Sequence, residues 1–592
     1  MRVADYIINK IHSINISHIF MVTGRGALFL TDAVAANKNI KSISVHHEQT
    51  AAYAAVAYAQ YTGSLGACLV STGCASTNAI TGVLNAWQDG IPCLFISGQN
   101  KLHETTRFTG IPIRTYGQQE ADIIPLVESI TKYSVMITDP KLIVYELEKA
   151  LYLAQTGRKG PVWIDIPLDI QNMRIEPDEL EHFEVKNDEN YNSCQEDVQF
   201  VAQLLNKAKR PVILIGSGIH SSGAIKELEI FQEKFKIPLT YASSTPDAYG
   251  LNYALSIGSV GAMGCSRAGN FSIQNSDLIL VFGCRLSSMT TGEFCKFGRK
   301  AKIVVVDIDP VEHSKNGVNI DHLVISDIKN FLTLIVNEKI KETEKKWIRK
   351  CIHWKNIFPK CEERHKESEK IDLYYLSECL SEALPDKSIF LSDSGLVELI
   401  LPTNISFGKN QRCIHPASQG SMGFALPALI GAYYASNLPV IAVIGDGSIM
   451  MNLQELETIS YKNIPAKIFV INNNAYAVIR KRQVEMFRSR TIGTDPSDGI
   501  SCPNFEKVAS SFDISFVRIE SSSNLLHGLK SVIDMNGPVL CEIMGLENQS
   551  YIRSGHALDV NKKIVSRPIE DQKPYIDRAV FLSEMIVEPV DQ

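Results

Sequence analysis

Short apolar runs alternate with longer amphipathic or alanine-rich stretches along most of this sequence. In the first third, the runs SHIFMV, GACLVST, PCLFISG and GPVWIDI are separated by stretches such as EQTAAYAAVAYAQYTG. The pattern returns at RPVILIGSG, DLILVFGCR and KIVVVDIDP, and again at IFLSDSG, LPVIAVIGDGS, AKIFVINNN and GPVLCEI. Apolar strands that alternate with helices are typical of parallel sheets covered by helices. We therefore predict an α/β protein with three doubly wound parallel-sheet domains and a C-terminal tail.

The length of 592 residues supports several domains, because one hydrophobic core rarely organises so long a chain. The segment from Asn172 to Asp197 is acidic and polar, which suits a solvated connector. Residues 339–370 are strongly charged but carry Trp347, Ile348 and Trp354, which predicts an exposed helix that buries one stripe. The predicted domains are residues 1–175, 195–340 and 371–550, with the tail at 551–592.

Composition narrows the class of ligand. The formal charge of −6 is small and spread along the chain, which argues against nucleic acid and against an anionic membrane surface as partners. The amino-terminal segment lacks the uninterrupted apolar region of a signal peptide, and no segment is apolar enough to span a bilayer. The 13 cysteines have no CxxC pair, so we interpret them as reduced thiols. We expect a cytoplasmic protein that binds small molecules.

The stretch from Ile441 to Gln483 is the most informative about chemistry. The strand-like run AVIGDGS is followed by one helical segment and a second strand, KIFVINNN. Asp446 and Asn473 then lie at adjacent strand ends, where open parallel sheets bind ligands. Carboxylate and amide oxygens suit Mg²⁺, and backbone amides in a turn before a helix suit a diphosphate. The alternative is two unrelated turns at strand ends.

The wider pattern of GDG and NN resembles the cofactor-binding motif of thiamin-diphosphate enzymes. It is carried by residues 445–447 and 472–473. The resemblance implies that Mg²⁺ is bound by the side chains of Asp446 and Asn473 and by the carbonyl of Ala475. It also implies that the cofactor's diphosphate and aminopyrimidine groups contact Gly395, Gly420, Met422, Gly445, Gly447 and Ser448.

Three further residues match positions at which this family activates its cofactor and lines its reaction pocket. A protein must promote loss of the weakly acidic C2 proton of thiamin diphosphate. Glu48 resembles the glutamate that hydrogen-bonds the aminopyrimidine ring, although alone it could be a helix-capping acid. Met451 matches the apolar side chain that bends the cofactor, and it could also be ordinary core packing. Gln119, in GQQEADI, resembles a pocket glutamine, the alternative being a surface amide.

The resemblance covers almost the whole chain and is nearest to the acetolactate synthase large-subunit branch. It is carried by HEQTAAYAAVAYAQYTG, GCASTNAITGVLNAWQDGIPCLFISGQ, GQQEADI, GPVWIDIPLDIQ and VVVDIDP. That branch implies decarboxylation of pyruvate, carboligation, and an FAD in the middle domain with no required redox step. The implied flavin contacts are Gly216, Gly218, Arg285, Asp307 and Asp327. Glycine turns and strand-end acids are also ordinary features of Rossmann-like domains.

Departures from the branch concern the acceptor substrate. Arg482 stands where these enzymes carry a tryptophan, Arg25 replaces a small residue, and GCASTN replaces GPGATN. An arginine makes a negatively charged or larger acceptor plausible. A bacterial subgroup associated with branched-sugar biosynthesis is resembled by the segments SRAGNF, NNNAYAVIR, GTDPSDGISCPNFEKVA and IVSRPIEDQKPYIDR. The acceptor is therefore either a 2-oxo acid or a nucleotide keto-sugar.

The sequence is compatible with more than one oligomeric state and with activities other than carboligation. In related enzymes the domain with the glutamate meets the diphosphate-binding domain of a second chain, so we expect a homodimer or a homotetramer. Alternatives to a carboligase are a simple 2-oxo acid decarboxylase, an oxidase, or a non-catalytic regulatory homologue. The presence of Glu48, Asp446, Asn473 and Met451 argues against the last of these.

Overall fold

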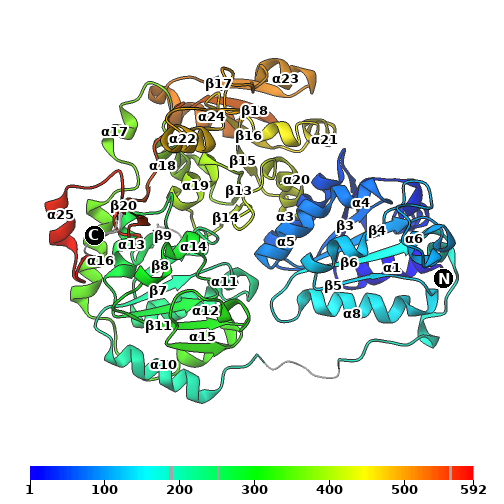
Figure 1. The fold of residues 1–592 in the computed structure, drawn as a ribbon, viewed down its shortest axis with the longest axis horizontal. Helices are drawn as coiled ribbons and strands as arrows, with labels where there is room; N and C mark the ends of the chain where they lie inside the picture. The colour runs from blue at the N-terminus through cyan, green and yellow to red at the C-terminus, as the bar shows by residue number, and fades with distance from the viewer. Residues whose placement is uncertain (186–190, 250–252, 559–562, 591–592) are drawn as a thin grey trace.

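The computed structural model describes residues 1–185, 191–249, 253–558 and 563–590 (Figure 1). Its main elements form three six-stranded sheets, in each of which the strands pair in parallel. Neighbouring residues of a strand pack into different cores. Phe20, for example, belongs to one hydrophobic cluster, whereas Ile19 and Met21 belong to another. Each sheet is therefore covered on both faces, and the predicted α/β class with three doubly wound domains is confirmed.

The first sheet has the strand order β2-β1-β3-β4-β6-β5. Its strands are β1 (His18–Met21), β2 (Lys41–Ser44), β3 (Gly66–Val70), β4 (Cys93–Gln99), β5 (Tyr133–Met136) and β6 (Pro161–Pro167). The helices are α1 (Val3–Ser13), α2 (Leu28–Ala36), α3 (Glu48–Thr62), α4 (Cys74–Asn78), α5 (Ile80–Asp89), α6 (Thr106–Thr109), α7 (Ile124–Val127), α8 (Ile143–Gln155) and α9 (Leu168–Asn172). Strands β3, β4 and β6 are buried throughout, which explains their uninterrupted apolar sequences.

The middle sheet has the order β12-β11-β10-β7-β8-β9. Its strands are β7 (Pro211–Ile215), β8 (Leu239–Ala242), β9 (Ser256–Val260), β10 (Leu278–Phe282), β11 (Lys302–Asp307) and β12 (His322–Ile325). The helices are α10 (Gln195–Lys207), α11 (Gly218–Ser221), α12 (Ile225–Phe235), α13 (Arg267–Gln274), α14 (Ser288–Thr291), α15 (Ile328–Ile335) and α16 (Lys345–Ile357). Trp347 and Trp354 of α16 are buried while the charged residues around them face solvent, so the predicted one-stripe helix is confirmed.

The third sheet has the order β14-β13-β15-β16-β18-β17. Its strands are β13 (Ser388–Ser392), β14 (Gln411–Ile414), β15 (Val440–Gly445), β16 (Lys467–Asn472), β17 (Ser515–Ile519) and β18 (Val539–Met544). The helices are α17 (Glu363–Lys366), α18 (Leu373–Ala383), α19 (Leu396–Asn404), α20 (Ala425–Ser436), α21 (Glu455–Tyr461), α22 (Ala477–Met486), α23 (Phe505–Ser511) and α24 (Leu525–Asp534).

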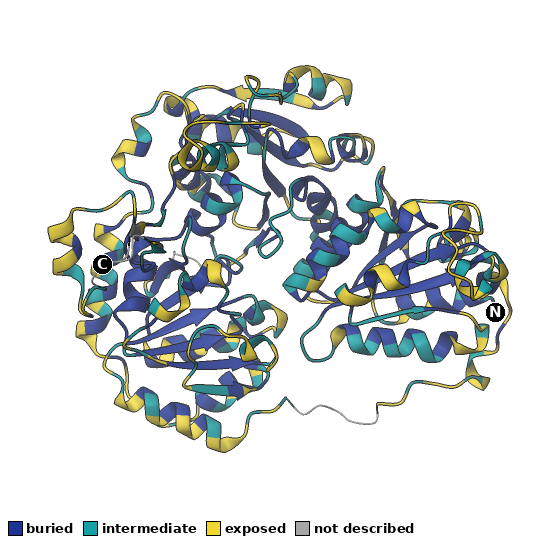
Figure 2. Ribbon diagram, in the orientation of Figure 1, coloured by how far each residue is buried: buried dark blue, intermediate teal, exposed yellow. Residues whose placement is uncertain are grey.

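The first and third domains share one hydrophobic core. Helices α3 and α20 pack side by side between their two sheets (Figure 1), and one cluster of buried residues contains side chains from both. The approach is close, because a Cβ atom added to Gly431 would lie 2.0 Å from the carbonyl oxygen of Ala54. Figure 2 shows both helices as buried over much of their length.

The tail folds back onto the middle and third domains. It contains β19 (Arg553–Ser554), β20 (His556–Leu558), β21 (Ile564–Ser566), β22 (Gln572–Lys573) and α25 (Arg578–Glu584). Phe581 packs edge-on against Phe271, and the Trp354 indole donates a 2.9 Å hydrogen bond to Glu584. Within the described ranges, no helix has both the length and the apolar character needed to cross a membrane.

Candidate active site

Two neighbouring strands of the third sheet carry the central motif. Strands β15 and β16 pair in parallel, with Gly445 opposite Ile471. The backbone amide of Asp446 extends this pairing by donating a 3.0 Å hydrogen bond to the Ile471 carbonyl. Asp446 and Asn473 therefore leave the sheet side by side, as predicted from the positions of the two motifs.

The carboxylate of Asp446 is buried and held by backbone amides. It accepts hydrogen bonds from Gly447 (2.8 Å), Asn473 (3.1 Å) and Asn474 (2.7 Å). Burial raises the pKa of this carboxyl, and the same backbone hydrogen bonds oppose that rise. A bound cation would favour the charged form of Asp446 and offset the cost of burying it.

The backbone around the Asp446 carboxylate brings further oxygen atoms that suit a metal ion close to it. Asn473 is 8% exposed, and its side-chain oxygen accepts a 3.3 Å hydrogen bond from the Ala475 amide. A Cβ atom at Gly447 would lie 2.1 Å from Cε1 of Tyr476, so any larger residue there would displace the Tyr476 ring. Carboxylate, amide and carbonyl oxygens form a donor set suited to Mg²⁺.

A cavity of about 400 Å³ opens beside these residues. It lies between the ends of β15 and β16 and the amino-terminal end of α19. The predicted positions that line it are Gly395, Met422, Gly445, Asp446, Gly447, Ser448, Asn473 and Ala475. Gly395 directly precedes α19 at φ +84°. Gly420, at φ +59°, lies beside this wall, because a Cβ atom there would be 3.3 Å from Oε2 of Glu398, another lining residue.

Asp393 is a buried residue of this site that the sequence analysis did not single out. Its carboxylate accepts hydrogen bonds from the amides of Gly423 (3.0 Å) and Ala425 (2.8 Å) and from the Ser448 hydroxyl. Burial raises the pKa of the Asp393 carboxyl, and these hydrogen bonds oppose the rise. The available signal was its position directly after the apolar run IFLS, where strand β13 ends.

The first domain places Glu48 next to the third domain. Glu48 begins α3, and its carboxylate accepts a 2.9 Å hydrogen bond from Asn78. The next residues contact Asn452 directly: the Asn452 amide donates a 3.0 Å bond to Gln49, and the Thr50 hydroxyl donates a 3.3 Å bond to Asn452. The structure thus brings the start of α3 to the segment that carries Met451.

Met451 lies at the end of a short 3₁₀ turn (Ile449–Met451). Its side chain is 48% exposed, and a Cβ atom at Gly423 would lie 2.5 Å from the Met451 Cβ. Gln119 is exposed at φ +63°, and its carbonyl oxygen occupies the space that a Cβ atom at Gly73 would need. Gln119 is therefore near the end of β3 in the first domain. None of the three predicted catalytic residues, Glu48, Gln119 and Met451, lines the 400 Å³ cavity.

A second cavity, of about 200 Å³, lies between the middle and first domains. Its lining includes four of the predicted flavin contacts: Gly218, Arg285, Asp307 and Asp327. Gly216 lies beneath it, where a Cβ atom would be 2.4 Å from the Gly283 carbonyl oxygen. Closely packed glycines and acidic residues at strand ends form one surface of this cavity, a combination that fits a nucleotide.

Charged residues from the first domain close one side of this second cavity. Arg158 forms ion pairs with Asp309 (3.0 Å) and Glu312 (2.6 Å) of the middle domain. Arg285 donates a 2.7 Å hydrogen bond to Ser418 of the third domain. The cavity is therefore bounded by all three domains.

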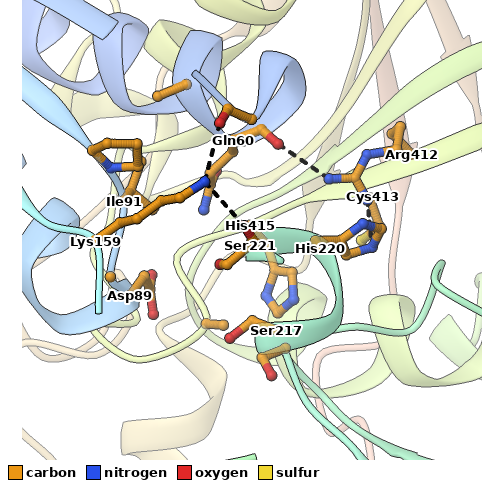
Figure 3. Close-up of a pocket in the computed structure, with 16 residues that line it drawn as sticks. Gln60, Asp89, Ile91, Lys159, Ser217, His220, Ser221, Arg412, Cys413 and His415 are labelled. Carbon is orange, nitrogen blue, oxygen red and sulfur yellow. Dashed lines mark hydrogen bonds between the residues drawn. The ribbon is translucent and has the colours of Figure 1, made fainter. Parts of the chain in front are cut away.

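A small neighbouring cavity marks the junction of the three domains (Figure 3). Lys159 of the first domain donates a 2.9 Å hydrogen bond to the Ser221 carbonyl of the middle domain. Arg412 of the third domain contacts His220 at 2.6 Å and donates a 3.2 Å bond to the Gln60 carbonyl. The side chains of Lys159 and Arg412 therefore connect the three domains.

Family models match each of the three domains. Residues 1–126 match the thiamine pyrophosphate enzyme N-terminal TPP binding domain, residues 198–335 the central domain, and residues 393–543 the C-terminal TPP binding domain. Thiamine pyrophosphate is thiamin diphosphate, the cofactor implied by the residues around Asp446.

Similar proteins cover nearly the whole chain. The acetolactate synthase large subunit of Buchnera aphidicola subsp. Schizaphis graminum is 33% identical over 88% of this chain and 90% of its own. The acetolactate synthase large subunit of Haemophilus influenzae is 29% identical over 96% of this chain and 99% of its own length. The acetolactate synthase isozyme 2 large subunit of Escherichia coli is 28% identical over 92% of this chain and 95% of its own length. The chain therefore belongs to the thiamin-diphosphate enzymes, in the family of the acetolactate synthase large subunits.

Proposed function

We propose that this enzyme decarboxylates pyruvate with thiamin diphosphate and Mg²⁺ and joins the remaining two-carbon unit to a second carbonyl compound. The observation that carries the proposal is the paired strand ends, which place Asp446, Asn473 and Ala475 beside a 400 Å³ cavity. The names of the similar proteins support the same reaction class.

The residues of the chain have distinct tasks in this proposal. When bound, thiamin diphosphate supplies a nucleophilic carbon at C2 of its thiazolium ring. Asp446, Asn473 and the Ala475 carbonyl hold Mg²⁺, and the turn at Gly445, Gly447 and Ser448 holds the diphosphate. Gly395, Gly420 and Met422 supply backbone groups on the facing wall.

Glu48 and Met451 act on reactivity rather than on affinity. In this proposal the Glu48 carboxylate would hold a proton at the aminopyrimidine ring, and the Met451 side chain would support the bound cofactor. Within one chain, the contacts of Gln49 and Thr50 with Asn452 bring the start of α3 beside the segment of Met451. In the expected dimer, the domain that carries Glu48 meets the diphosphate-binding domain of the second chain. Gln119 is assigned to substrate contact by resemblance, from its position at the end of β3.

FAD is the proposed occupant of the cavity between the middle and first domains. The glycine floor at Gly216 and Gly218 suits close approach of a dinucleotide backbone, and Asp307 and Asp327 supply acceptors for hydroxyl groups. Arg285 supplies a cation at the junction. A homodimer or homotetramer and a cytoplasmic location also stay predictions.

The acceptor is a 2-oxo acid or a nucleotide keto-sugar. Arg482 supports a charged acceptor because it lines the 400 Å³ cavity. A simple decarboxylase would release an aldehyde and an oxidase would release an acid, so the products distinguish these reactions.

The deciding experiment is incubation of the purified enzyme with thiamin diphosphate, Mg²⁺, FAD and pyruvate, followed by CO₂ measurement and mass spectrometry. We expect CO₂ together with a ligated product. Efficient formation of acetolactate would identify pyruvate as the acceptor, whereas slow turnover accelerated by a nucleotide keto-sugar would identify the sugar. CO₂ with free acetaldehyde, or no CO₂ under any condition, would refute carboligation.

The metal assignment has its own test. Asp446→Ala removes the charged ligand and should weaken Mg²⁺-dependent binding of thiamin diphosphate at least about tenfold. Calorimetric titration of the cofactor with and without Mg²⁺ measures this effect. The matched control is Asp534→Ala, at an exposed position on the end of α24. Equal affinities in the two variants would exclude Asp446 as a ligand.

A further inference from the structure

A larger cavity, of about 970 Å³, adjoins the cofactor cavity. Met263 and Arg482 line both, so the two spaces meet at this pair of side chains. The Arg482 guanidinium also contacts the Met263 sulfur at 3.8 Å. A molecule in the larger cavity can therefore extend toward the cofactor.

The walls of this cavity come from three separate parts of the chain. They are the middle-domain segments around Met263 and Met289, helix α22, and the C-terminal tail. Arg553 of the tail pairs with Met263 in an antiparallel bridge, and on its other side it lies opposite Lys573 in the β19–β22 pair. Residues opposite one another on adjacent strands point to the same face. Met263, Arg553 and Lys573 therefore form one row along the wall.

The charges along this wall do not cancel. Arg553 pairs with Glu485 of α22 at 2.7 and 2.8 Å, and Glu293 is 3.1 Å from the ammonium of Lys296. By contrast, no carboxylate among the described residues forms an ion pair with Arg482 or Lys573; the Lys573 ammonium lies 5.8 Å from the Tyr575 ring centre. After these pairings, two cations face the cavity without a counter-charge.

We propose that this cavity is the acceptor subsite and that it takes a carbonyl compound carrying a phosphate or diphosphate ester. The inference rests on the proposed function, because the acceptor carbonyl must reach the cofactor cavity past Met263 and Arg482. Two uncompensated cations match the charge of a diphosphate ester. The volume is ample for a ligand larger than pyruvate.

The apolar part of the lining fits the rest of such a ligand. Met263, Met289 and Met486 line the cavity, and methionine side chains adapt to flat or irregular surfaces. Lys573 and Arg553 belong to the tail, whereas the cofactor residues belong to the third sheet. The tail is thus assigned a role in acceptor selection, separate from cofactor binding.

The test is direct binding to the enzyme saturated with thiamin diphosphate, Mg²⁺ and FAD. Isothermal titration would compare UDP-glucose, glucose 1-phosphate and inorganic phosphate. We expect UDP-glucose to bind most tightly and its affinity to fall as salt is raised. Lys573→Met and Arg482→Met should each weaken this binding at least about tenfold, the effect of losing one hydrogen bond to a charged group.

Lys530→Met is the matched control, because Lys530 is an exposed lysine on α24 outside the cavity. Melting temperatures and cofactor affinity check that the variants fold. The proposal is overturned if neither ester binds, if inorganic phosphate binds as tightly as the esters, or if Lys530→Met weakens binding equally.

Binding and turnover separate the two proposals. Calorimetry requires no reaction, so an enzyme that releases no CO₂ from pyruvate but binds UDP-glucose through Lys573 would retain the subsite and lose the proposed function. An enzyme that converts pyruvate but binds neither ester would retain the function and lose the subsite.

Discussion

At the scale of single residues, Glu48 shows how local position and tertiary contact combine. It starts α3 a short loop after strand β2, and an acidic side chain is favourable near a helix amino terminus. Its carboxylate accepts a hydrogen bond from Asn78, and the following residues contact Asn452. Helix capping alone would not require that second set of contacts.

Glu48→Gln should keep the binding of cofactor and Mg²⁺ but slow exchange of the C2 proton by a factor of about 100 or more, since the amide cannot serve as an acid or base. Deuterium exchange into the cofactor, followed by NMR after quenching, measures this rate. Glu196→Gln, an exposed acid in the first turn of α10, is the matched control. An exchange rate close to that of the wild type would remove Glu48 from this role.

Asp165 is a buried acid in the core of the first domain. It lies on β6 opposite Ser97, accepts a 2.6 Å hydrogen bond from the Ser97 hydroxyl, and accepts a 3.2 Å bond from the Gln99 amide. Burial raises its pKa to about 7, although these hydrogen bonds oppose the rise. The folded protein therefore favours the protonated form of Asp165 more strongly than the unfolded chain does.

This difference predicts a dependence of stability on pH. Because its pKa is higher in the folded protein, Asp165 contributes stability to the folded state at low pH. This contribution is fully present below the unfolded-state pKa of about 4 and is lost as pH rises toward about 7. Asp165→Asn cannot ionise, so its free energy of unfolding should fall less between pH 4 and 7 than that of the wild type. Urea unfolding of both proteins across this range measures the difference. Parallel curves would show that Asp165 does not titrate there.

At the scale of elements, the contact of α3 with α20 explains the alanine-rich sequence EQTAAYAAVAYAQYT. Both helices are buried over much of their surface, so neither shows a strongly polar face. Small residues let their backbones approach closely, as the space around Gly431 shows. The alanine-rich composition of α3, which by itself indicated only a helix, is therefore needed for the close packing of the first domain against the third.

Gly431→Ala should destabilise the protein by about 1–3 kcal/mol, because its Cβ atom would lie 2.0 Å from the Ala54 carbonyl oxygen and the helices must separate. Thermal melting would show a transition several degrees lower. The matched control is Gly317→Ala, where the nearest atom to the new Cβ is at 3.6 Å. If both variants melt together, the close approach of α3 and α20 is not needed for stability.

At the scale of the whole molecule, Arg412 connects three domains. It forms an ion pair with Asp247 of the middle domain. It also contacts His220 and donates a hydrogen bond to the Gln60 carbonyl of the first domain (Figure 3). Burial opposes ionisation of Asp247, but the charges of Arg412 and His220 lower the pKa of its carboxyl well below the usual range. The charge on Asp247 therefore depends on Arg412.

Arg412→Met should cost on the order of 3 kcal/mol, because it leaves a buried carboxylate without its main cation. Differential scanning calorimetry should show a lower melting temperature and separation of domain transitions. Lys530→Met removes an ion pair with Glu382 in which the two side chains are 47% and 61% exposed, and it should have little effect. Adding Asp247→Asn to Arg412→Met should recover part of the loss. Equal melting of the two single variants would contradict a structural role for the junction.

Local patterns in the sequence were enough to predict the architecture and the centre of the site. Apolar runs of strand length, separated by helical stretches, predicted three parallel sheets, since hydrophobic periodicity is a local property. Asp446 and Asn473 were predicted to meet because polar residues that end adjacent parallel strands share one sheet edge. The stripe of Trp347 and Trp354 followed from the same local reasoning.

Contacts between distant segments, by contrast, became known only from the folded chain. The contact of α3 with Asn452, the hydrogen bonds around Asp393, and the row of Met263, Arg553 and Lys573 join residues far apart in the chain. Such contacts depend on how whole domains and the tail dock, which no local period of apolar residues encodes. The meeting of Asp446 and Asn473 was therefore predictable from two strand ends, and the cofactor followed from the resemblance of their motifs to the thiamin-diphosphate enzymes. The wall of the proposed acceptor cavity required the docked domains and tail.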